Sequence, residues 1–467
     1  MAHAQFVSSD DIRSRFSKAM SDMYRQEVPQ YGTLLDLVAD INADVLKAKP
    51  ELNAQLERSG EIGRLGVERH GAIRLGTAEE LANIRRVFGV MGMSAVGYYD
   101  LSVAGVPVHS TAFRQIHEEQ LSANPFRVFT SLLRLELIED EALRARAADI
   151  LAQRKIFSER TLALVEQAER EGGLNSADAD EFVAEALTTF RWHASATVTA
   201  QTYQDLLQAH RLVADVVCFH GPHINHLTPR TLSIDDAQVE MPKRGISAKD
   251  VIEGPPRREH PILLRQTSFK ALEEPIAFTD DAGTTSGTHT ARFGEIEQRG
   301  VALTAKGREL YDRLLASVRS MGGEGSASAS YGDRLAQAFE AFPDDLDAMR
   351  DQELAFFKYS VTPAGAAAAA QSSDASAPSG MGLAELVRAG FVKADPIVYE
   401  DFLPVSAAGI FQSNLGGTEQ RSYTANAAKS RFESDLGASV MDEIALYAAT
   451  QKRSIEAVGK VFAGVAA

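Results

Sequence analysis

LGVERHGAIRLGTAEELANIRRVFGVMG covers residues 65–92, and SAVGYYDLS (94–102) and VPVHSTAFR (106–114) follow it closely. The first eleven residues, 65–75, contain two glycines and no helical stripe of apolar side chains, which favours a strand. Thr77 then has a glutamate three residues after it, the capping-box pattern that begins a helix. The two later segments are rich in Val, Tyr, Thr and Phe, which favour strands. The sequence therefore predicts the order strand, helix, strand, strand.

A looser version of this order recurs after residue 219. We expect an extended segment, a short helix and three strands, in this order: HINHLTPRTL, IDDAQVEMPKRG, then PILLRQTSFKAL, PIAFTD and HTARFGEIEQRG. The architecture repeats here, whereas the sequence does not. Outside the two repeats, apolar residues three and four apart predict helices over 10–60 and 126–215, including long helices at 132–157 and 176–198.

Composition limits the classes of partner and compartment. The chain has 467 residues, 45% of them hydrophobic, and its 48 basic and 64 acidic residues give a net charge of −16. Such a surface repels nucleic acid and anionic membranes. Cys218 is the single cysteine, which excludes an internal disulfide and an iron–sulfur site. No apolar run approaches the ~20 residues of a membrane helix, and the N-terminus turns acidic where a signal peptide is apolar. We therefore expect a soluble, cytoplasmic protein.

Histidines give the clearest chemical signal. His220, His223 and His226 lie within FHGPHINHLTPR, and imidazole is the commonest transition-metal ligand. If the segment is extended, His220 and His226 share one face while His223 points away. The alternative is a polar loop whose three histidines form ordinary hydrogen bonds.

Two further segments could complete a metal site. On an extended VERHGAIRL, His70 and Arg74 share one face, so a metal ligand would lie near a guanidinium that can grip a carboxylate. In RFGEIEQRG, Glu295 and Glu297 share a face, and either could be a ligand or a solvated side chain. Two histidines and one carboxylate from separate strands would form the 2-His-1-carboxylate set of non-haem Fe(II) enzymes.

This arrangement resembles the vicinal oxygen chelate superfamily, whose paired βαβββ modules curl around a metal. The strings ERHGAIRLGT, FHGPHINHLTPR, ILLRQTSFKALEEP, FGEIEQRG and YEDFLPVSAAGIF are more closely similar to the 2-oxoadipate dioxygenase/decarboxylase family, from about residue 20 onwards. The resemblance implies an enzyme that uses Fe(II) and O2 to convert 2-oxoadipate to 2-hydroxyglutarate and CO2 in lysine catabolism. It also implies an α+β fold: a curved mixed β-sheet around the metal, wrapped by long helices.

The resemblance also assigns roles to residues. It implies that His70, His226 and Glu295, rather than Glu297, bind Fe(II), that Arg74 binds the distal carboxylate, and that Gln266 lines the pocket. It places Val405 and Ser406 in a loop that closes over the substrate. The organisation it implies is one catalytic unit over 1–467, divided as follows: a first module at 65–115, a helical insertion at 116–218, a second module at 219–300, and a helical C-terminal part at 301–467 with a low-complexity stretch at 362–380 and an active-site loop at 399–411.

Two other functions stay open at this point. The same fold and metal site could catalyse a non-oxidative isomerase or lyase reaction on an oxo acid, with Zn²⁺, Ni²⁺ or Mn²⁺ as the metal. The protein could also bind a dicarboxylate without catalysis. Uptake of O2 separates the oxidative reaction from the first alternative, and turnover excludes the second.

Overall fold

The structure is a computed structural model that describes residues 6–280, 283–320, 330–370, 381–403 and 421–462. The chain forms two compact units. The first unit comprises Met1–Glu253, Gln266–Gln298 and Asp401–Met441, and the second comprises Gly254–Arg265, Arg299–Glu400 and Asp442–Ala467. All the candidate metal ligands lie in the first unit.

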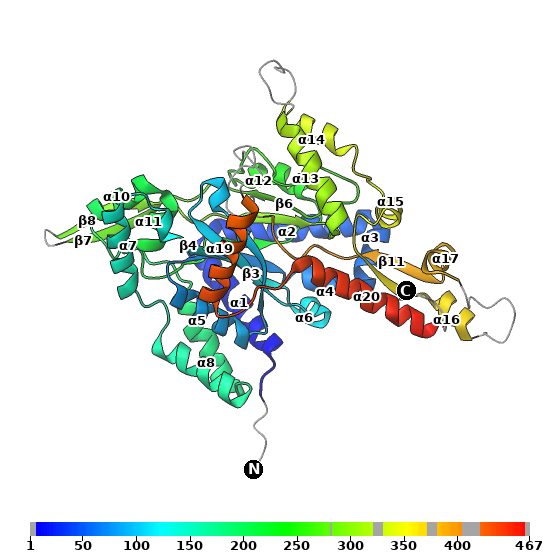
Figure 1. The fold of residues 1–467 in the computed structure, drawn as a ribbon, viewed down its shortest axis with the longest axis horizontal. Coiled ribbons are helices and arrows are strands. Elements are labelled where there is room, and N and C mark those ends of the chain that lie inside the picture. The colour runs from blue at the N-terminus through cyan, green and yellow to red at the C-terminus, as the bar shows by residue number, and fades with distance from the viewer. Residues whose placement is uncertain (1–5, 281–282, 321–329, 371–380, 404–420, 463–467) are drawn as a thin grey trace, which may run out of the picture. The chain divides into compact units, whose positions relative to one another are not determined.

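The first unit contains a five-stranded mixed sheet with strand order β2-β3-β4-β1-β5. Two of its strands, β3 and β4, are labelled in Figure 1. Its strands are β1 (Arg69–Leu75), β2 (Ser94–Asp100), β3 (Val108–Arg114), β4 (Phe126–Leu133) and β5 (Leu227–Pro229). β1 runs parallel to β4, whereas the β2–β3, β3–β4 and β1–β5 pairs are antiparallel. The predicted α+β fold with a mixed sheet is therefore confirmed, and its first module has the βαβββ order of a vicinal oxygen chelate-like fold.

The helix of this module, α5 (Ala78–Val90), begins as the sequence predicts. The Thr77 side chain accepts a hydrogen bond from the Glu80 backbone N–H at 3.1 Å. The Glu80 carboxylate, however, accepts from the backbone N–H of Gly76 instead of that of Thr77. The threonine cap is thus confirmed, while the reciprocal bond of the capping box is displaced by one residue.

The helix predicted from residue 126 is wrong at its start. Residues 126–133, FRVFTSLL, form β4, which lies between β3 and β1 and is buried along its whole length. A strand covered on both faces shows a continuous apolar run without alternation, and such a run cannot be distinguished from a helix by periodicity. The rest of the predicted long helix shortens to η2 (Leu135–Leu137) and α7 (Glu141–Gln153). The helix predicted over 176–198 ends at Thr188.

The two faces of the sheet differ in chemistry. One face carries apolar side chains such as Ile73 and Val128, and it packs against α1 (Ser9–Glu27) and α5. Phe16 of α1 lies edge-on to Phe126, with ring centroids 5.9 Å apart, and Phe88 of α5 contacts Phe113 at 5.0 Å. The opposite face carries His70, Arg74 and their neighbours. Burial of the apolar face thus orients the polar residues toward the candidate site.

After residue 219 the structure contains the expected short helix and one strand more than the three expected. The helix is α12 (Ile234–Lys243), the strands at the expected places are β6 (Leu264–Ser268), β7 (Glu274–Asp280) and β9 (Glu295–Arg299), and the unpredicted strand is β8 (Gly283–His289). β6 pairs with β9, and β7 pairs with β8 as an antiparallel hairpin. Residues 223–226 form no strand, because β5 begins only at Leu227. The remaining elements of this unit are α2 (Pro29–Ala48), α3 (Pro50–Arg58), α4 (Ile62–Leu65), η1 (Ser102–Ala104), α6 (Glu118–Ala123), α8 (Glu159–Glu171), α9 (Ser176–Thr188), α10 (Ala200–Ala209), α11 (Arg211–Val217) and α19 (Arg421–Leu436).

The second unit is mainly helical. Its elements are α13 (Ala305–Ser320), α14 (Tyr331–Phe339), α15 (Leu346–Asp351), β10 (Phe357–Val361), α16 (Pro363–Ala370), α17 (Leu383–Arg388), β11 (Val392–Pro396) and α20 (Glu443–Val461), with β10 and β11 paired antiparallel. Part of the predicted low-complexity stretch is therefore helical, since alanine has the highest helix propensity and α16 contains five in a row. No helix in the described ranges is long and apolar enough to cross a membrane.

Candidate metal site

Three buried side chains from three segments converge on one point. His70 comes from β1, His226 immediately precedes β5, and Glu295 begins β9. Their ligand atoms all lie within 4.8 Å of one another. Glu295 Oε1 lies 3.0 Å from His70 Nε2 and 3.8 Å from His226 Nε2. This is the predicted set of two histidines and one carboxylate, brought together from residues far apart in sequence.

Hydrogen bonds fix the orientation of the Glu295 carboxylate. Gln266 Nε2 donates to Glu295 Oε1 at 2.8 Å, and Thr228 Oγ1 donates to the same atom at 3.1 Å. Among the described residues, no lysine or arginine lies within ion-pair distance of this carboxylate. A buried carboxylate held only by neutral donors and two imidazoles lacks a permanent counter-charge, which a metal cation would supply.

Glu297 lies on the other side of the His70 ring. Its Oε2 is 2.7 Å from His70 Nδ1, whereas Nε2 of the same ring faces Glu295. A metal-binding histidine commonly has a carboxylate at its second ring nitrogen, which fixes its orientation and makes it a stronger ligand. The two glutamates of β9 therefore contact opposite nitrogens of one imidazole. The sequence pattern could not tell which of the two glutamates faces the second histidine.

The pKa values follow from this geometry. Burial opposes protonation of His70, but the carboxylates of Glu297 and Glu295 outweigh it and raise the pKa of His70. Burial lowers the pKa of His226 to about 4. Burial alone would raise the pKa of Glu295, yet His226 and His70 lower it. The carboxylates of Glu297 and Glu295 thus favour a positive charge at this point, which a metal cation would supply. The residues fit a metal site.

A second group of two histidines and a carboxylate lies elsewhere in the first unit. Asp215 of α11 contacts His289 Nε2 at 2.8 Å through Oδ1, and His223 Nε2 lies 3.3 Å from the same oxygen. The other ring nitrogen of His289 hydrogen bonds with Tyr203 at 2.9 Å. We call Asp215, His223 and His289 the Asp215 cluster. His223, one of the three histidines of the sequence motif, thus belongs to a different site, while His220 is exposed.

Arg74 joins the two sites. It lies four residues from His70 on β1, and its Nη1 donates to Asp215 Oδ2 at 2.6 Å. Its guanidinium contributes to lowering the pKa of both His226 and His210, although burial is the larger cause for each. The structure therefore places the Arg74 cation on the side of the sheet that carries the metal ligands, with Asp215 as its counter-ion.

The other predicted site residues have different outcomes. Gln266 contacts the Glu295 carboxylate, so in this structure it touches a candidate metal ligand rather than open space. Val405 and Ser406 lie outside the described residues. The chain before them is anchored: Asp401 pairs with Arg114 at 2.6 Å, and Phe402 lies edge-on to His70 with centroids 5.0 Å apart.

Sequence reasoning did not identify three residues that the geometry brings into these sites. Thr228 could have been predicted from the sequence, because it lies two residues after the candidate ligand His226. Asp215 and His289 could not have been predicted, since no motif marks either residue. Asp215 lies in the helix α11, and His289 ends the strand β8. Only the tertiary structure brings Asp215 of α11 to Arg74 of β1.

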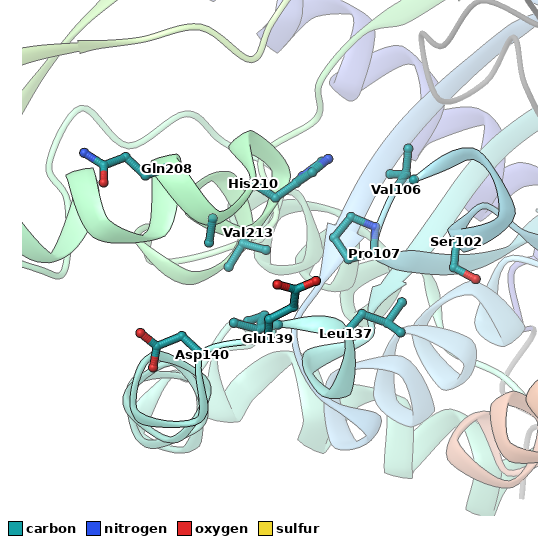
Figure 2. A pocket seen from close by; sticks show the side chains of 12 residues that line it. Ser102, Val106, Pro107, Leu137, Glu139, Asp140, Gln208, His210 and Val213 are labelled. Atoms are coloured by element: carbon teal, nitrogen blue, oxygen red, sulfur yellow. The ribbon is translucent and has the colours of Figure 1, made fainter. Parts of the chain in front are cut away.

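A surface cavity of about 690 Å³ lies at one end of the sheet (Figure 2). Val106 and Pro107, which directly precede β3, line one side, and His210 and Val213 of the α10–α11 segment face them. The candidate metal ligands do not line it. Because β1 is parallel to β4 and β4 ends where β3 begins, the cavity lies at the end of the sheet that carries Arg74.

The first unit thus combines a βαβββ module of the vicinal oxygen chelate-like type with a buried group of two histidines and one carboxylate, contributed by β1, by the segment before β5 and by β9, that could hold a metal. A sequence profile of the 2-oxoadipate dioxygenase/decarboxylase family matches residues 16–414, and the chain belongs to this family. It is 60% identical over 455 residues to the 2-oxoadipate dioxygenase/decarboxylase of Pseudomonas putida, covering 97% of each chain. It is 58% identical over 453 residues to that of Escherichia coli, covering 97% of this chain and 98% of the relative.

A solved structure supports the same relationship. The crystal structure of the hydroxyglutarate synthase from Pseudomonas putida in complex with 2-oxoadipate matches with a TM-score of 0.89 and 57% identity. The match covers 98% of this chain and 99% of that chain. The family resemblance drawn from the sequence motifs is therefore confirmed.

Proposed function

We propose that this protein is an Fe(II)-dependent 2-oxoadipate dioxygenase/decarboxylase. The reaction converts 2-oxoadipate and O2 to 2-hydroxyglutarate and CO2, and both oxygen atoms enter the products. The observation that carries the proposal is the convergence of His70, His226 and Glu295, in a chain whose relatives bear this name. A place in lysine catabolism remains an expectation from the family resemblance.

His70, His226 and Glu295 would hold the iron. An Fe(II) ion held by these residues would supply the redox chemistry of the reaction with the 2-oxo acid and O2. The protein supplies orientation. Gln266 and Thr228 hold the Glu295 carboxylate in place, and Glu297 fixes the His70 ring so that Nε2 faces the site.

Arg74 would bind the carboxylate of the substrate that lies far from the 2-oxo group. The substrate is a dianion and the chain has a net charge of −16, so a local cation is needed to attract it. The planar guanidinium can bind a carboxylate through two parallel hydrogen bonds. We propose that Val405 and Ser406 contribute to the loop that closes over the substrate.

An oxygen-electrode assay with Fe(II) and 2-oxoadipate tests the proposal. We expect one O2 consumed for each CO2 and each 2-hydroxyglutarate formed, and no uptake by His226→Ala under the same conditions. Turnover of 2-oxoadipate without O2 uptake would instead support a lyase or isomerase. Binding of 2-oxoadipate without any turnover would support a dicarboxylate-binding protein.

A further inference from the structure

Two buried serines lie beside Arg74 on the face of the sheet that carries the metal ligands. Arg74 of β1 is in register with Ser131 of β4, and Ser131 is in register with Ser110 of β3. Residues in register on neighbouring strands point to the same side of the sheet. Arg74, Ser131 and Ser110 therefore form a row across three strands, parallel to the row that begins at His70.

The two serine hydroxyls contact each other at 2.8 Å. Ser110 is completely buried and Ser131 is 6% exposed. Each hydroxyl carries one proton, and their mutual hydrogen bond uses only one of the two. Within the described ranges neither hydroxyl has another partner. One buried O–H donor therefore lacks an acceptor, which a native structure rarely leaves uncompensated.

Arg74, whose side chain is 21% exposed, also has N–H donors without an acceptor in the described part of the chain. A guanidinium has five N–H donors and cannot accept a hydrogen bond. In the described part of the chain, the contact with Asp215 Oδ2 is the acceptor that Arg74 finds. The group formed by Arg74, Ser131 and Ser110 thus offers several donors in one place. A ligand that only accepts hydrogen bonds, with negative charge, fits it best, and a carboxylate has both properties.

The row formed by Arg74, Ser131 and Ser110 lies at a distance from the metal ligands that matches the far end of a substrate bound to the metal. His70 and Arg74 are four residues apart on one strand, roughly 13 Å between their backbones at ~3.3 Å per residue. Ala72 lies between them on the same face, and its side chain is only a methyl group. A ligand bound to the metal at one end can therefore extend along β1 toward Arg74 and Ser131.

We propose that Ser131, supported by Ser110, donates a hydrogen bond to the distal carboxylate of the substrate that Arg74 holds. This inference rests on the proposed function and adds two specificity-determining residues to it. Ser131 is next to Arg74, so its proton goes to the carboxylate. Ser110 lies one strand farther away, so its proton goes to Ser131 Oγ and strengthens that donor. The two serines therefore have unequal roles.

The test compares two substrates of equal length, 2-oxoadipate and 2-oxohexanoate, which has a methyl group in place of the distal carboxylate. A hydrogen bond to a charged group is worth about 1.5–3 kcal/mol, or about 10- to 150-fold in affinity. We expect Ser131→Ala to lower the preference for 2-oxoadipate by about 10-fold or more, measured as the ratio of kcat/KM values. Ser110→Ala should lower it by about threefold or less, since Ser131 keeps its proton. Anaerobic calorimetry of 2-oxoadipate binding to the Fe(II)-loaded protein should show the same order.

A matched control lies on the same strand. Thr130 is adjacent to Ser131 but points to the opposite face, where its hydroxyl donates to the Val128 carbonyl at 3.3 Å. Thr130→Val removes a buried hydroxyl and should leave the substrate preference unchanged. Ser131→Thr retains the hydroxyl and should restore most of the preference that Ser131→Ala loses.

The outcomes separate this inference from the proposed function. If the wild-type protein does not turn over 2-oxoadipate, the proposed function fails. If it does, and Ser131→Ala keeps the wild-type preference or loses both substrates equally, the serine assignment is overturned and the function stands. Should Ser131→Ala fail to fold, Ser131→Cys conserves the volume with only a weak donor and carries the same test.

Discussion

The metal-ligand group and the Asp215 cluster contain the same residue types but differ in their charge balance. Both consist of two histidines and one carboxylate, and every member is buried. In the Asp215 cluster, Arg74 already neutralises the carboxylate at 2.6 Å. At Glu295, two uncharged donors and the imidazoles surround the carboxylate, and a second carboxylate, Glu297, lies beside His70. A divalent cation would neutralise the negative charge of the glutamates in the metal-ligand group. In the Asp215 cluster it would add positive charge to a carboxylate that Arg74 already neutralises.

Hydrogen bonds do not separate the two groups. His289 uses both ring nitrogens, one toward Asp215 and the other toward Tyr203. Each group nevertheless has a buried imidazole nitrogen without a hydrogen-bond partner among the described residues, Nδ1 of His226 in the metal-ligand group and Nε2 of His223 in the Asp215 cluster. The comparison shows that residue types and proximity do not suffice to define a metal site. The groups that surround the ligands decide whether a cation is required.

The largest expected effect is loss of the metal. His70→Ala and His226→Ala should each abolish iron retention and reduce turnover about 1,000-fold or more, because two remaining ligands hold a metal weakly. His223→Ala and His220→Ala should retain iron. Metal content of the purified variants, measured by mass spectrometry, checks this. Loss of iron in His223→Ala with iron kept in His226→Ala would mean that the Asp215 cluster is the metal site.

The two glutamates of β9 provide a sharper comparison within the metal site. Glu295→Ala should lose iron as completely as the histidine variants, since it removes a ligand. Glu297→Ala should weaken iron binding by about 10- to 100-fold, because it only frees the His70 ring. Titration with Fe(II) under anaerobic conditions measures both affinities. Equal iron affinity in the two variants would contradict the assignment of Glu295 as the ligand.

Arg74 lies on the same strand as the metal ligand His70 and contacts Asp215 of the Asp215 cluster. Its replacement tests whether it binds the substrate or only stabilises that cluster. Arg74→Ala should keep its iron but lose about 100-fold in kcat/KM for 2-oxoadipate, since two charge-assisted hydrogen bonds to the substrate disappear. Arg74→Lys keeps the charge without the planar fork and should be intermediate. The loss should shrink for 2-oxo acids without a distal carboxylate. An equal loss with such monocarboxylates would show that Arg74 is structural.

The pH dependence of metal binding distinguishes the groups further. The pKa of His70 is raised, and a metal must displace its proton, so iron affinity should fall by about tenfold per pH unit below that pKa. His226, with a pKa of about 4, is already neutral in this range and adds no slope. Competition with a chelator between about pH 5 and 8 measures the dependence. Glu297→Ala should move the loss to lower pH, because it removes a carboxylate that favours His70 protonation. An iron affinity independent of pH would contradict the role of His70.

The smallest expected effect is on the Asp215 cluster itself. Asp215→Asn removes the counter-charge of Arg74 and should lower the free energy of unfolding by about 1–3 kcal/mol. Iron content should stay at the wild-type level. Urea unfolding of the wild type and the variant gives the difference. A loss of iron together with unchanged stability would assign the cluster a role in metal binding that its charge balance argues against.

Much of the fold was readable from local sequence patterns. The strand, helix, strand, strand order after residue 65 and the cap at Thr77 follow from side-chain periodicity and hydrogen-bonding chemistry, which act over a few residues. β4 was missed because a strand buried on both faces shows no alternation. The two glutamates of β9 could be placed on one face, but no local pattern tells which one meets the metal ligands.

By itself, the sequence determined the family, the secondary structure of most of the first module and the residue types that can bind a metal, since these depend on local chemistry and on recognisable motifs. Only the tertiary structure decided which histidines belong together. His223 and His226 are three residues apart, yet the irregular backbone before β5 directs them to different carboxylates, Asp215 and Glu295. The contacts of those carboxylates, with Arg74 in one case and with Gln266 and Thr228 in the other, come from distant segments. The charge balance of a buried site depends on all the charged and polar groups close to it in space, and these groups come from segments that are far apart in the sequence.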